Sequence, residues 1–314
     1  MAAVRPPVRA LLEGLIDYAG LFPPAKLDMR AAVENYAAYL AGPDAWALGR
    51  FVVPLARLDE LEGAASALLP RVPEAVPWRL SVLGGSDPAH DAEVIFAFNE
   101  RHAHGAAGRA VIDMLEAKAA DIESLTRVAR SVPAGVAAYV EIPIAGDPAD
   151  LLAALAAQGA GAKVRTGGVT PEAFPSPREL ARFIRLAADQ GVPFKATAGL
   201  HHPIRSEYPL TYDTGSARGT MYGYLNLFLA AAFAQEGLSI AEIEEVLEER
   251  DPSAFAFDET GVRWRGRFAG PESIAALRTR VALSFGSCSF TEPVGELRAL
   301  GLLQPLSHGG RHAS

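Results

Sequence analysis

Three observations predict an α/β fold for this sequence, specifically a closed (β/α)8 barrel. Short runs of β-branched and aromatic residues alternate with longer alanine- and leucine-rich stretches of helical spacing. The connections between them are short, and repeated βα units of this kind imply parallel strands joined by right-handed crossovers. Seven such units occupy the first 200 residues. A series of that length favours a closed barrel over an open doubly wound sheet.

The expected elements follow one another in a regular order. Seven strands are predicted, at 15–22, 49–54, 78–85, 110–116, 137–144, 161–168 and 193–200. Six helices are predicted between them, at 28–41, 57–69, 89–103, 120–131, 147–158 and 176–190. Several of these helices stop at a glycine, as in QGAGAK and DQGVPF, which is typical of a left-handed capping residue.

The alternation breaks after residue 200, where a long polar segment begins. Helical patterns, a hairpin or short β excursion at 255–266 and a further helix precede the segment SFGSCSF. We place the eighth strand at about 281–287, which makes 201–280 an elaboration of the seventh unit. A strand at 254–264 is the alternative.

The whole chain, residues 1–314, is expected to form this single barrel domain. The polar, glycine-containing tail at 306–314 is expected to fray.

Composition excludes several classes of partner. The net charge of −8 argues against a nucleic-acid or anionic-membrane surface, which needs a basic face. Cys288 is the single cysteine, so no intrachain disulfide can form and a reducing compartment is expected. The N-terminus carries prolines and Glu13 where a signal peptide needs an apolar run, and the apolar run 227–234 is too short to span a bilayer. A cytoplasmic protein without nucleic-acid or membrane partners is predicted. A homo-oligomer stays open, because the apolar helix around 225–234 suits a core or an interface.

Two lysines stand out as candidate catalytic residues. The chain has 25 arginines but only four lysines, and Lys163 and Lys195 both fall in predicted strands one βαβ unit apart. If both point inward, like charge and burial disfavour the ammonium form, so the pKa of one lysine should fall toward neutrality; which one is left open. A neutral amine can attack a carbonyl and form a Schiff base, whereas arginine cannot be deprotonated. The alternative is a structural ion pair, for instance Lys163 with Glu141.

Other polar residues fall in or just after predicted strands, whose carboxyl ends carry the active site in such barrels. Asp113 interrupts an apolar strand, either as a proton shuttle or substrate anchor or as a buried counter-ion for a lysine. Asp17, in the first predicted strand, has the same two interpretations. The glycine-containing turns at 166–168 and 286–287 could offer backbone N–H groups to an anion. The candidate substrate-binding residues are Asp17, Glu141, Arg165, Thr166, Gly167, Gly168, Thr197, His201, His202, Arg205, Gly286 and Ser287.

The adjacent histidines His201 and His202 raise the question of a metal. Neighbouring residues on a strand point in opposite directions, and no H-x-H or H-E-x-x-H pattern occurs in the sequence. We therefore expect no metal and no other cofactor, with a hydrogen-bonding or acid–base role for one histidine. A metal-dependent lyase or hydrolase using Glu141, His201 and His202 is the alternative.

Four segments resemble the deoxyribose-phosphate aldolases and their class I aldolase relatives. LIDYAGLFPPAKLDMRAAV resembles the opening strand and helix of that family, and VIDMLEAKAADIESL resembles the segment with its catalytic aspartate. AKVRTGGVT resembles the strand whose lysine forms the Schiff base, and FKATAGLHHPIR the strand whose lysine perturbs the first. The order and approximate spacing agree over about residues 13–205. The resemblance implies a metal-free (β/α)8 barrel with Lys163 as the imine-forming residue, Lys195 as its partner and Asp113 as the proton relay.

Departures from the family pattern concern the substrate. Arg165 replaces a small hydroxyl residue beside the nucleophile, and LHHPIR stands where a compact glycine turn begins a phosphate site. Together with His201, His202 and Arg205, Arg165 suggests a carboxylate-bearing or differently phosphorylated substrate. The functional hypothesis is a carbon–carbon lyase, a class I aldolase acting on a small anionic carbonyl compound. A non-catalytic barrel that binds an anionic ligand is a further alternative.

Overall fold

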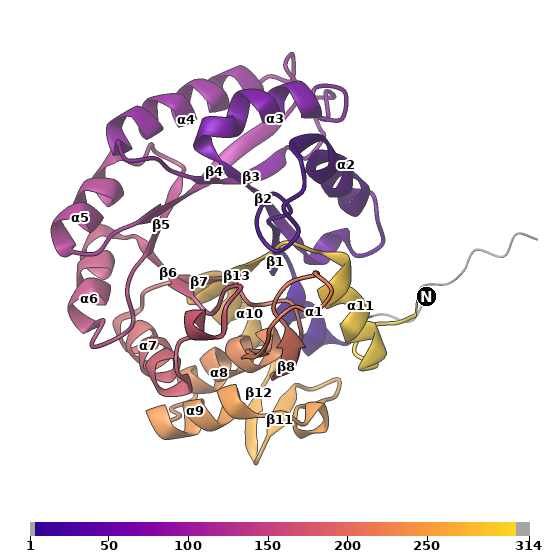
Figure 1. The fold of residues 1–314 in the computed structure, drawn as a ribbon, viewed down its shortest axis with the longest axis vertical. Coiled ribbons are helices and arrows are strands. Elements are labelled where there is room, and N and C mark those ends of the chain that lie inside the picture. Colours follow the sequence, from indigo (N-terminus) through magenta and orange to yellow (C-terminus); the bar gives the residue numbers. More distant parts are fainter. Residues whose placement is uncertain (1–3, 306–314) are drawn as a thin grey trace, which may run out of the picture.

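Eight parallel strands close into a barrel at the centre of the molecule (Figure 1). The computed structural model describes residues 4–305. The barrel strands are β1 (Ile16–Tyr18), β2 (Leu48–Pro54), β3 (Trp78–Leu83), β4 (Ala110–Lys118), β5 (Ala137–Glu141), β6 (Gly161–Arg165), β7 (Phe194–Thr197) and β13 (Ala282–Ser287). They run in chain order around the barrel, and β13 closes it between β7 and β1. The predicted (β/α)8 barrel is confirmed, as is an eighth strand at about 281–287.

Helices follow the strands and form the outer ring in Figure 1. They are α2 (Met29–Leu40), α3 (Leu58–Ala65), α4 (Pro88–His102), α5 (Ile122–Ser131), α6 (Ala149–Gln158), α7 (Pro177–Gln190) and α11 (Thr291–Ala299). Single 3₁₀ turns occupy Ala45–Ala47, Leu55–Arg57, Pro171–Ala173 and Pro252–Ala254. The ends of α7 show why the chain is helical there. Ser176 and Glu179 form a reciprocal capping box at its start, and Gly191 ends it with φ +65°.

The elaboration expected at 201–280 lies between β7 and β13. It comprises a hairpin, β8 (Ser206–Pro209) and β9 (Arg218–Met221), then α8 (Tyr224–Gln235), α9 (Ile240–Glu248), the small sheet β10 (Ala256–Phe257), β11 (Val262–Trp264) and β12 (Arg267–Ala269), and α10 (Pro271–Arg280). Residues 254–264, the alternative for the eighth strand, belong to this small antiparallel sheet outside the barrel, so that alternative is wrong.

Helix α8 is buried on all sides. Every residue from Tyr224 to Ala234 is buried, because α7, α9 and α10 pack around the helix and β13 lies beneath it. The apolar helix therefore belongs to the core of this chain, which explains why its sequence lacks a polar face.

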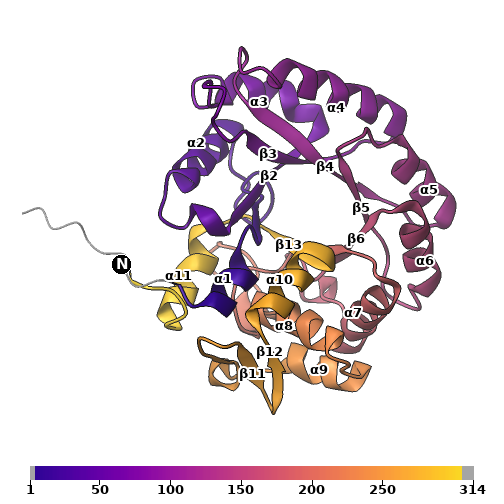
Figure 2. The same ribbon diagram turned by 180° about the vertical axis from the view of Figure 1, so that it is seen from behind.

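The chain reaches β1 through a short helix that the sequence analysis did not predict, α1 (Pro6–Leu12). It packs against α10 at the amino-terminal ends of β1 and β13, seen from behind in Figure 2. Arg278 joins these parts, because its guanidinium donates to the carbonyl oxygens of Leu11 and Glu13 and to those of two β13 residues.

Two expectations concern the membrane and the tail. No helix within residues 4–305 is both long and apolar enough to cross a bilayer. The predicted frayed tail at 306–314 lies outside the described residues.

Truncating a side chain between α8 and the barrel should measure how far the fold depends on this elaboration. Phe228 is fully buried, with its ring centroid 6.1 Å from that of Phe285 on β13. We expect Phe228→Ala to lower the free energy of unfolding by about 3–5 kcal/mol, because it leaves a cavity in the core. Equilibrium unfolding in urea measures this loss. Phe96→Ala is the matched control, since Phe96 is 61% exposed and its truncation should cost about 0.5 kcal/mol or less. Equal losses in the two variants would contradict a core role for α8.

Candidate active site

A cavity of about 310 Å³ lies at the carboxyl ends of the barrel strands. This is the end at which (β/α)8 enzymes bind their substrates. One part of its wall is apolar, formed by Phe22, Val52, Leu83 and Leu210. Another part carries titratable side chains, among them Glu116, Lys118, Glu141, Lys163, Arg165, Lys195 and His201. A pocket that combines an apolar wall with converging charged groups is the usual form of a small-molecule site.

The two strand lysines meet inside this cavity. Lys163 on β6 lies directly opposite Lys195 on β7 in the parallel register, and Glu141 on β5 lies opposite Lys163. Both lysine side chains line the cavity and are almost completely buried, at 5% and 1% exposure. The spacing of 32 residues thus predicted the neighbouring strands and the shared interior. The structural alternative is present too, since Lys163 Nζ lies 3.2 Å from Glu141 Oε2.

Glu116, at the end of β4, bridges the two lysines. Its Oε2 lies 2.8 Å from Lys163 Nζ and its Oε1 lies 2.5 Å from Lys195 Nζ. The hydroxyl of Ser81 donates a third hydrogen bond to Oε1 at 2.6 Å. Burial alone would raise the pKa of Glu116, but the two ammonium groups, Lys195 foremost, hold that pKa well below its usual range. Glu116 is therefore a carboxylate in this site.

Lys195 is fixed as a cation by a second carboxylate. Its Nζ lies 2.8 Å from Asp17 Oδ2, which also accepts a hydrogen bond from Ser284 at 2.7 Å. Burial would lower the pKa of Lys195, yet Asp17 and Glu116 raise it above its ordinary value. In turn, burial would raise the pKa of Asp17, and Lys195 brings it below its ordinary value. The expectation that burial and like charge draw a lysine toward neutrality is wrong for Lys195, because two buried carboxylates offset both effects.

The backbone of β2 passes close to the Asp17 carboxylate. Its Oδ1 accepts a hydrogen bond from the backbone N–H of Arg50 at 2.7 Å. A Cβ on the preceding residue, Gly49, would lie 2.3 Å from the same oxygen. A glycine is required at position 49 for this reason, and β2 thereby holds the carboxylate that holds Lys195.

Lys163 has a different setting from Lys195. Its two carboxylate neighbours are Glu116 and Glu141, and Glu141 is shared with Arg165 and Lys118 at the edge of the cavity. Burial would raise the pKa of Glu141, but Lys163, followed by Arg165 and Lys118, lowers it. Lys163 thus stands between two ionised carboxylates, and it shares one of them, Glu141, with the cations at the cavity edge.

Asp113 lies elsewhere, and the expectation that placed it beside the lysines is wrong. Its carboxylate accepts from Arg50 Nε at 2.6 Å and from Arg79 Nε at 2.7 Å, toward the amino-terminal half of the barrel. The cause is an irregularity in β4: successive residues of β3 pair with Ile112 and then Met114, so Asp113 is skipped. Three residues later, Glu116 takes the expected position. Its place at the very end of a predicted strand was the available signal.

The remaining predicted residues divide into two groups. Arg165, Gly168, Thr197, His201 and Gly286 line the cavity together with the lysines and Glu141. Gly167, Ser287, Asp17, Thr166, His202 and Arg205 do not line it. Of these, Asp17 acts from behind Lys195, as described above.

The predicted anion turn at 166–168 mainly supports the neighbouring loop. The hydroxyl of Thr166 donates to the carbonyl of Ala198 at 2.6 Å. Ala198 has φ +62°, a left-handed conformation that L-residues rarely adopt. A Cβ on Gly199, φ +72°, would lie 2.9 Å from Gly167 Cα. These contacts fix the turn that leads from β7 to His201.

Arg205 points away from the cavity. Its guanidinium carbon lies 4.6 Å from the ring centroid of Tyr222, and its backbone N–H donates to Asn226 at 2.9 Å. Its contacts therefore favour a structural role at the start of the elaboration.

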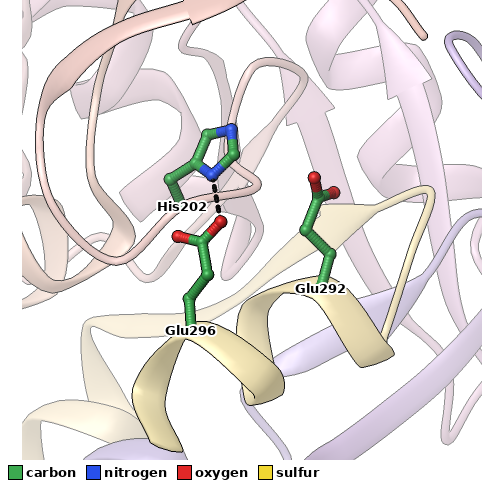
Figure 3. A group of neighbouring side chains, drawn as sticks. All are labelled: His202, Glu292 and Glu296. Carbon is green, nitrogen blue, oxygen red and sulfur yellow. Dashed lines mark hydrogen bonds and ion pairs between the residues drawn. The ribbon is translucent and has the colours of Figure 1, made fainter. Parts of the chain in front are cut away.

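The three residues of the metal-dependent alternative, Glu141, His201 and His202, do not form a ligand group. The group of potential ligands that the described part of the chain does assemble is His202, Glu292 and Glu296, with their ligand atoms within 4.8 Å of one another (Figure 3). Glu141 is engaged by Lys163 and the two cations at the cavity edge instead. In Figure 3 both glutamates project from α11, and His202 Nδ1 meets Glu296 Oε1 at 2.6 Å. This hydrogen bond ties the loop after β7 to α11.

Removing the bridging carboxylate should expose how much the fold depends on it. We expect Glu116→Gln to lower the free energy of unfolding by about 3–5 kcal/mol, because two buried ammonium groups lose their common partner. Thermal and urea unfolding at neutral pH measure the loss. Glu60→Gln is the matched control, since its ion pair with Arg57 is on the surface and its loss should change the stability little. A Glu116 variant as stable as that control would contradict a bridging role.

The same variant should change the response to acid. A carboxyl group whose pKa is lowered by folding stabilises the folded state above its ordinary pKa, 4.5 for Glu116, and that contribution is lost as the pH falls. The wild-type protein should therefore lose stability progressively below about pH 4.5, and Glu116→Gln should show a shallower acid limb.

Comparison with known proteins gives no family for this chain: no protein-family model matches it, and no curated protein does. The likeness to the aldolases rests on the four quoted segments and remains an expectation. The function has to be argued from the cavity itself.

Proposed function

We propose that the protein is a class I aldolase or a related carbon–carbon lyase that forms a Schiff base between Lys163 and a small anionic carbonyl compound. One observation carries the proposal: two buried lysines line one cavity and share a single carboxylate, Glu116, one on each of its oxygens. A merely structural ion pair needs one lysine and one carboxylate. A second lysine fixed beside the first is useful where a proton has to be moved.

Lys163 is the better nucleophile of the two. Lys195 Nζ is held between Asp17 and Glu116, and its raised pKa keeps it protonated. Lys163 has no contact with Asp17, and one of its two carboxylate neighbours, Glu141, is shared with Arg165 and Lys118. Lys195 then remains as the fixed positive charge that holds Glu116 in place.

The reaction begins when the Lys163 ammonium loses a proton to solvent in the cavity, and the neutral amine then adds to the carbonyl carbon of the substrate. A proton returned from solvent to the carbinolamine hydroxyl lets that group leave as water, and an iminium ion remains on Lys163. The iminium accepts electrons from the neighbouring carbon–carbon bond as that bond breaks, or allows an enamine to attack a second carbonyl in the reverse direction.

The charge at the cavity edge favours an anionic substrate. Arg165 is 45% exposed and uses its Nε for Glu141, at 3.2 Å. Across residues 4–305 no hydrogen bond engages its two terminal nitrogens, which leaves a planar pair of donors for a carboxylate or phosphate. Lys118 and His201 add positive charge along the same lining. A volume of about 310 Å³ suits a metabolite of a few carbon atoms.

Reductive trapping tests the proposal directly. Pyruvate, dihydroxyacetone phosphate or acetaldehyde is incubated with the protein, and borohydride then reduces any imine to a stable amine that peptide mapping locates. We expect an adduct on Lys163 and none in Lys163→Arg. Lys26→Arg is the matched control, because Lys26 lies outside the cavity lining, and it should leave the adduct unchanged.

Two results would overturn the proposal. One is the absence of any adduct on Lys163 with all three probes. The other is a ligand that raises the melting temperature while no adduct forms, which would instead support a non-catalytic anion-binding barrel.

Substitution of Arg165 tests the preference for anions. We expect Arg165→Leu to raise the pyruvate concentration needed for half-maximal trapping by about tenfold or more, because a charge-assisted contact to the carboxylate is lost. The neutral probe acetaldehyde serves as the internal control and should require about the same concentration in both proteins. An equal change for both probes would show that Arg165 does not select for charge.

A further inference from the structure

The proposed reaction needs a group that moves a proton at the carbon next to the imine. Asp113, the residue expected to do so, is held by two arginines away from the cavity. Glu116 and Glu141 are surrounded by cations that hold their pKa values down, so neither is a proton donor at neutral pH. Lys118 and Arg165 pair with Glu141, which leaves His201 and Cys288 among the titratable groups of the cavity lining.

His201 is positioned by groups from two other segments. Its Nδ1 lies 3.4 Å from Glu292 Oε2 on α11 and 3.9 Å from Cys288 Sγ after β13. Tyr212, from the loop between β8 and β9, donates to the same Glu292 oxygen at 3.1 Å and lies 3.6 Å from Cys288 Sγ. The histidine, the thiol, the phenol and the carboxylate thus form one cluster, and His201 and Cys288 are its members that line the cavity.

This arrangement engages one edge of the imidazole ring only. The contacts to Glu292 and Cys288 both use Nδ1. Within the described chain Nε2 has no hydrogen-bond partner, although the side chain is only 10% exposed and belongs to the cavity lining. An imidazole held at Nδ1 by a carboxylate, with Nε2 free, is the arrangement in which histidine exchanges protons with a bound molecule.

We propose that His201 is the acid–base catalyst of this site and that it transfers the proton at the carbon next to the Lys163 imine through Nε2. The inference rests on the proposed Schiff-base function. In one direction Nε2–H gives its proton to the enamine carbon, the enamine becomes an iminium ion and the imidazole becomes neutral. In the other direction the neutral Nε2 removes a proton from that carbon, and the electron pair of the broken C–H bond forms the enamine. Glu292 keeps the ring oriented in both directions.

The charge state of the ring agrees with this role. Burial alone would lower the pKa of His201, but Cys288 and Glu292 raise it to about 9. The groups that face the ring are Cys288, Glu292, Tyr212 and, at a ring-centroid distance of 6.3 Å, His202. Because the pKa is raised, the proton is present at neutral pH and is lost as the pH rises through about 9. At neutral pH the ring therefore holds the proton that it gives to the enamine carbon.

Solvent-exchange measurements separate formation of the Lys163 imine from proton transfer at the neighbouring carbon. Pyruvate or dihydroxyacetone phosphate, whichever gives the borohydride adduct, is incubated with the protein in D₂O, and NMR follows replacement of the protons next to the carbonyl. We expect His201→Gln to form the Lys163 adduct as the wild type does but to exchange these protons about a hundredfold more slowly. Lys163→Arg gives the background rate.

A histidine far from the cavity supplies a matched control. His90 is an exposed residue of α4 outside the cavity lining, so His90→Gln should exchange at close to the wild-type rate. Circular dichroism confirms that each variant is folded.

Each outcome decides one of the two proposals. No adduct in the wild type overturns the Schiff-base function, and the role of His201 falls with it. An adduct together with wild-type exchange in His201→Gln overturns the role of His201 and leaves the Schiff base standing. A hundredfold loss in Cys288→Ala with unchanged exchange in His201→Gln would assign the proton transfer to the thiol instead.

Discussion

The structure of the site depends on the way in which Glu116 divides its carboxylate between two lysines. Two ammonium groups inside a barrel repel each other, and each costs free energy to remove from water. One carboxylate between them, with Asp17 on the far side of Lys195, makes this buried arrangement tolerable. The parallel register of β6 and β7 sets the lysines opposite each other, so the barrel determines the geometry and the carboxylates make it stable.

This network also explains the choice of lysine over arginine in a chain that is rich in arginine. Arginine also forms ion pairs with carboxylates, but its guanidinium cannot be deprotonated, so the proposed imine at position 163 requires an amine. Toward the amino-terminal half of the barrel, Arg50 and Arg79 hold Asp113 through charge-assisted hydrogen bonds. The cavity lining includes Arg165 too, but the two cations that meet at Glu116 are both amines.

The sequence predicted most of the fold because periodicity and turn residues act locally. It placed the eighth strand and the two lysines correctly for the same reason. The predicted strands 15–22, 161–168 and 193–200 extend past the observed ends of β1, β6 and β7, and the residues in excess, such as Ala19, Gly168 and Gly199, line the cavity. The amino-acid composition of these loops resembles that of strands because the loops are buried. Such a composition indicates burial and does not by itself indicate pairing with another strand.

The parts of the site that the sequence did not predict depend on contacts between distant segments. The alternation of side chains along a strand predicts the face that Asp113 occupies only if β4 is regular. The pairing of β4 with β3 is irregular, and Glu116 is the carboxylate that points inward instead. His201 and Glu292 are far apart in the chain and meet because the elaborated seventh unit returns to β13 before α11 begins. The elaboration therefore does more than enlarge the core, because it brings the phenol of Tyr212 against the thiol and the carboxylate that contact His201.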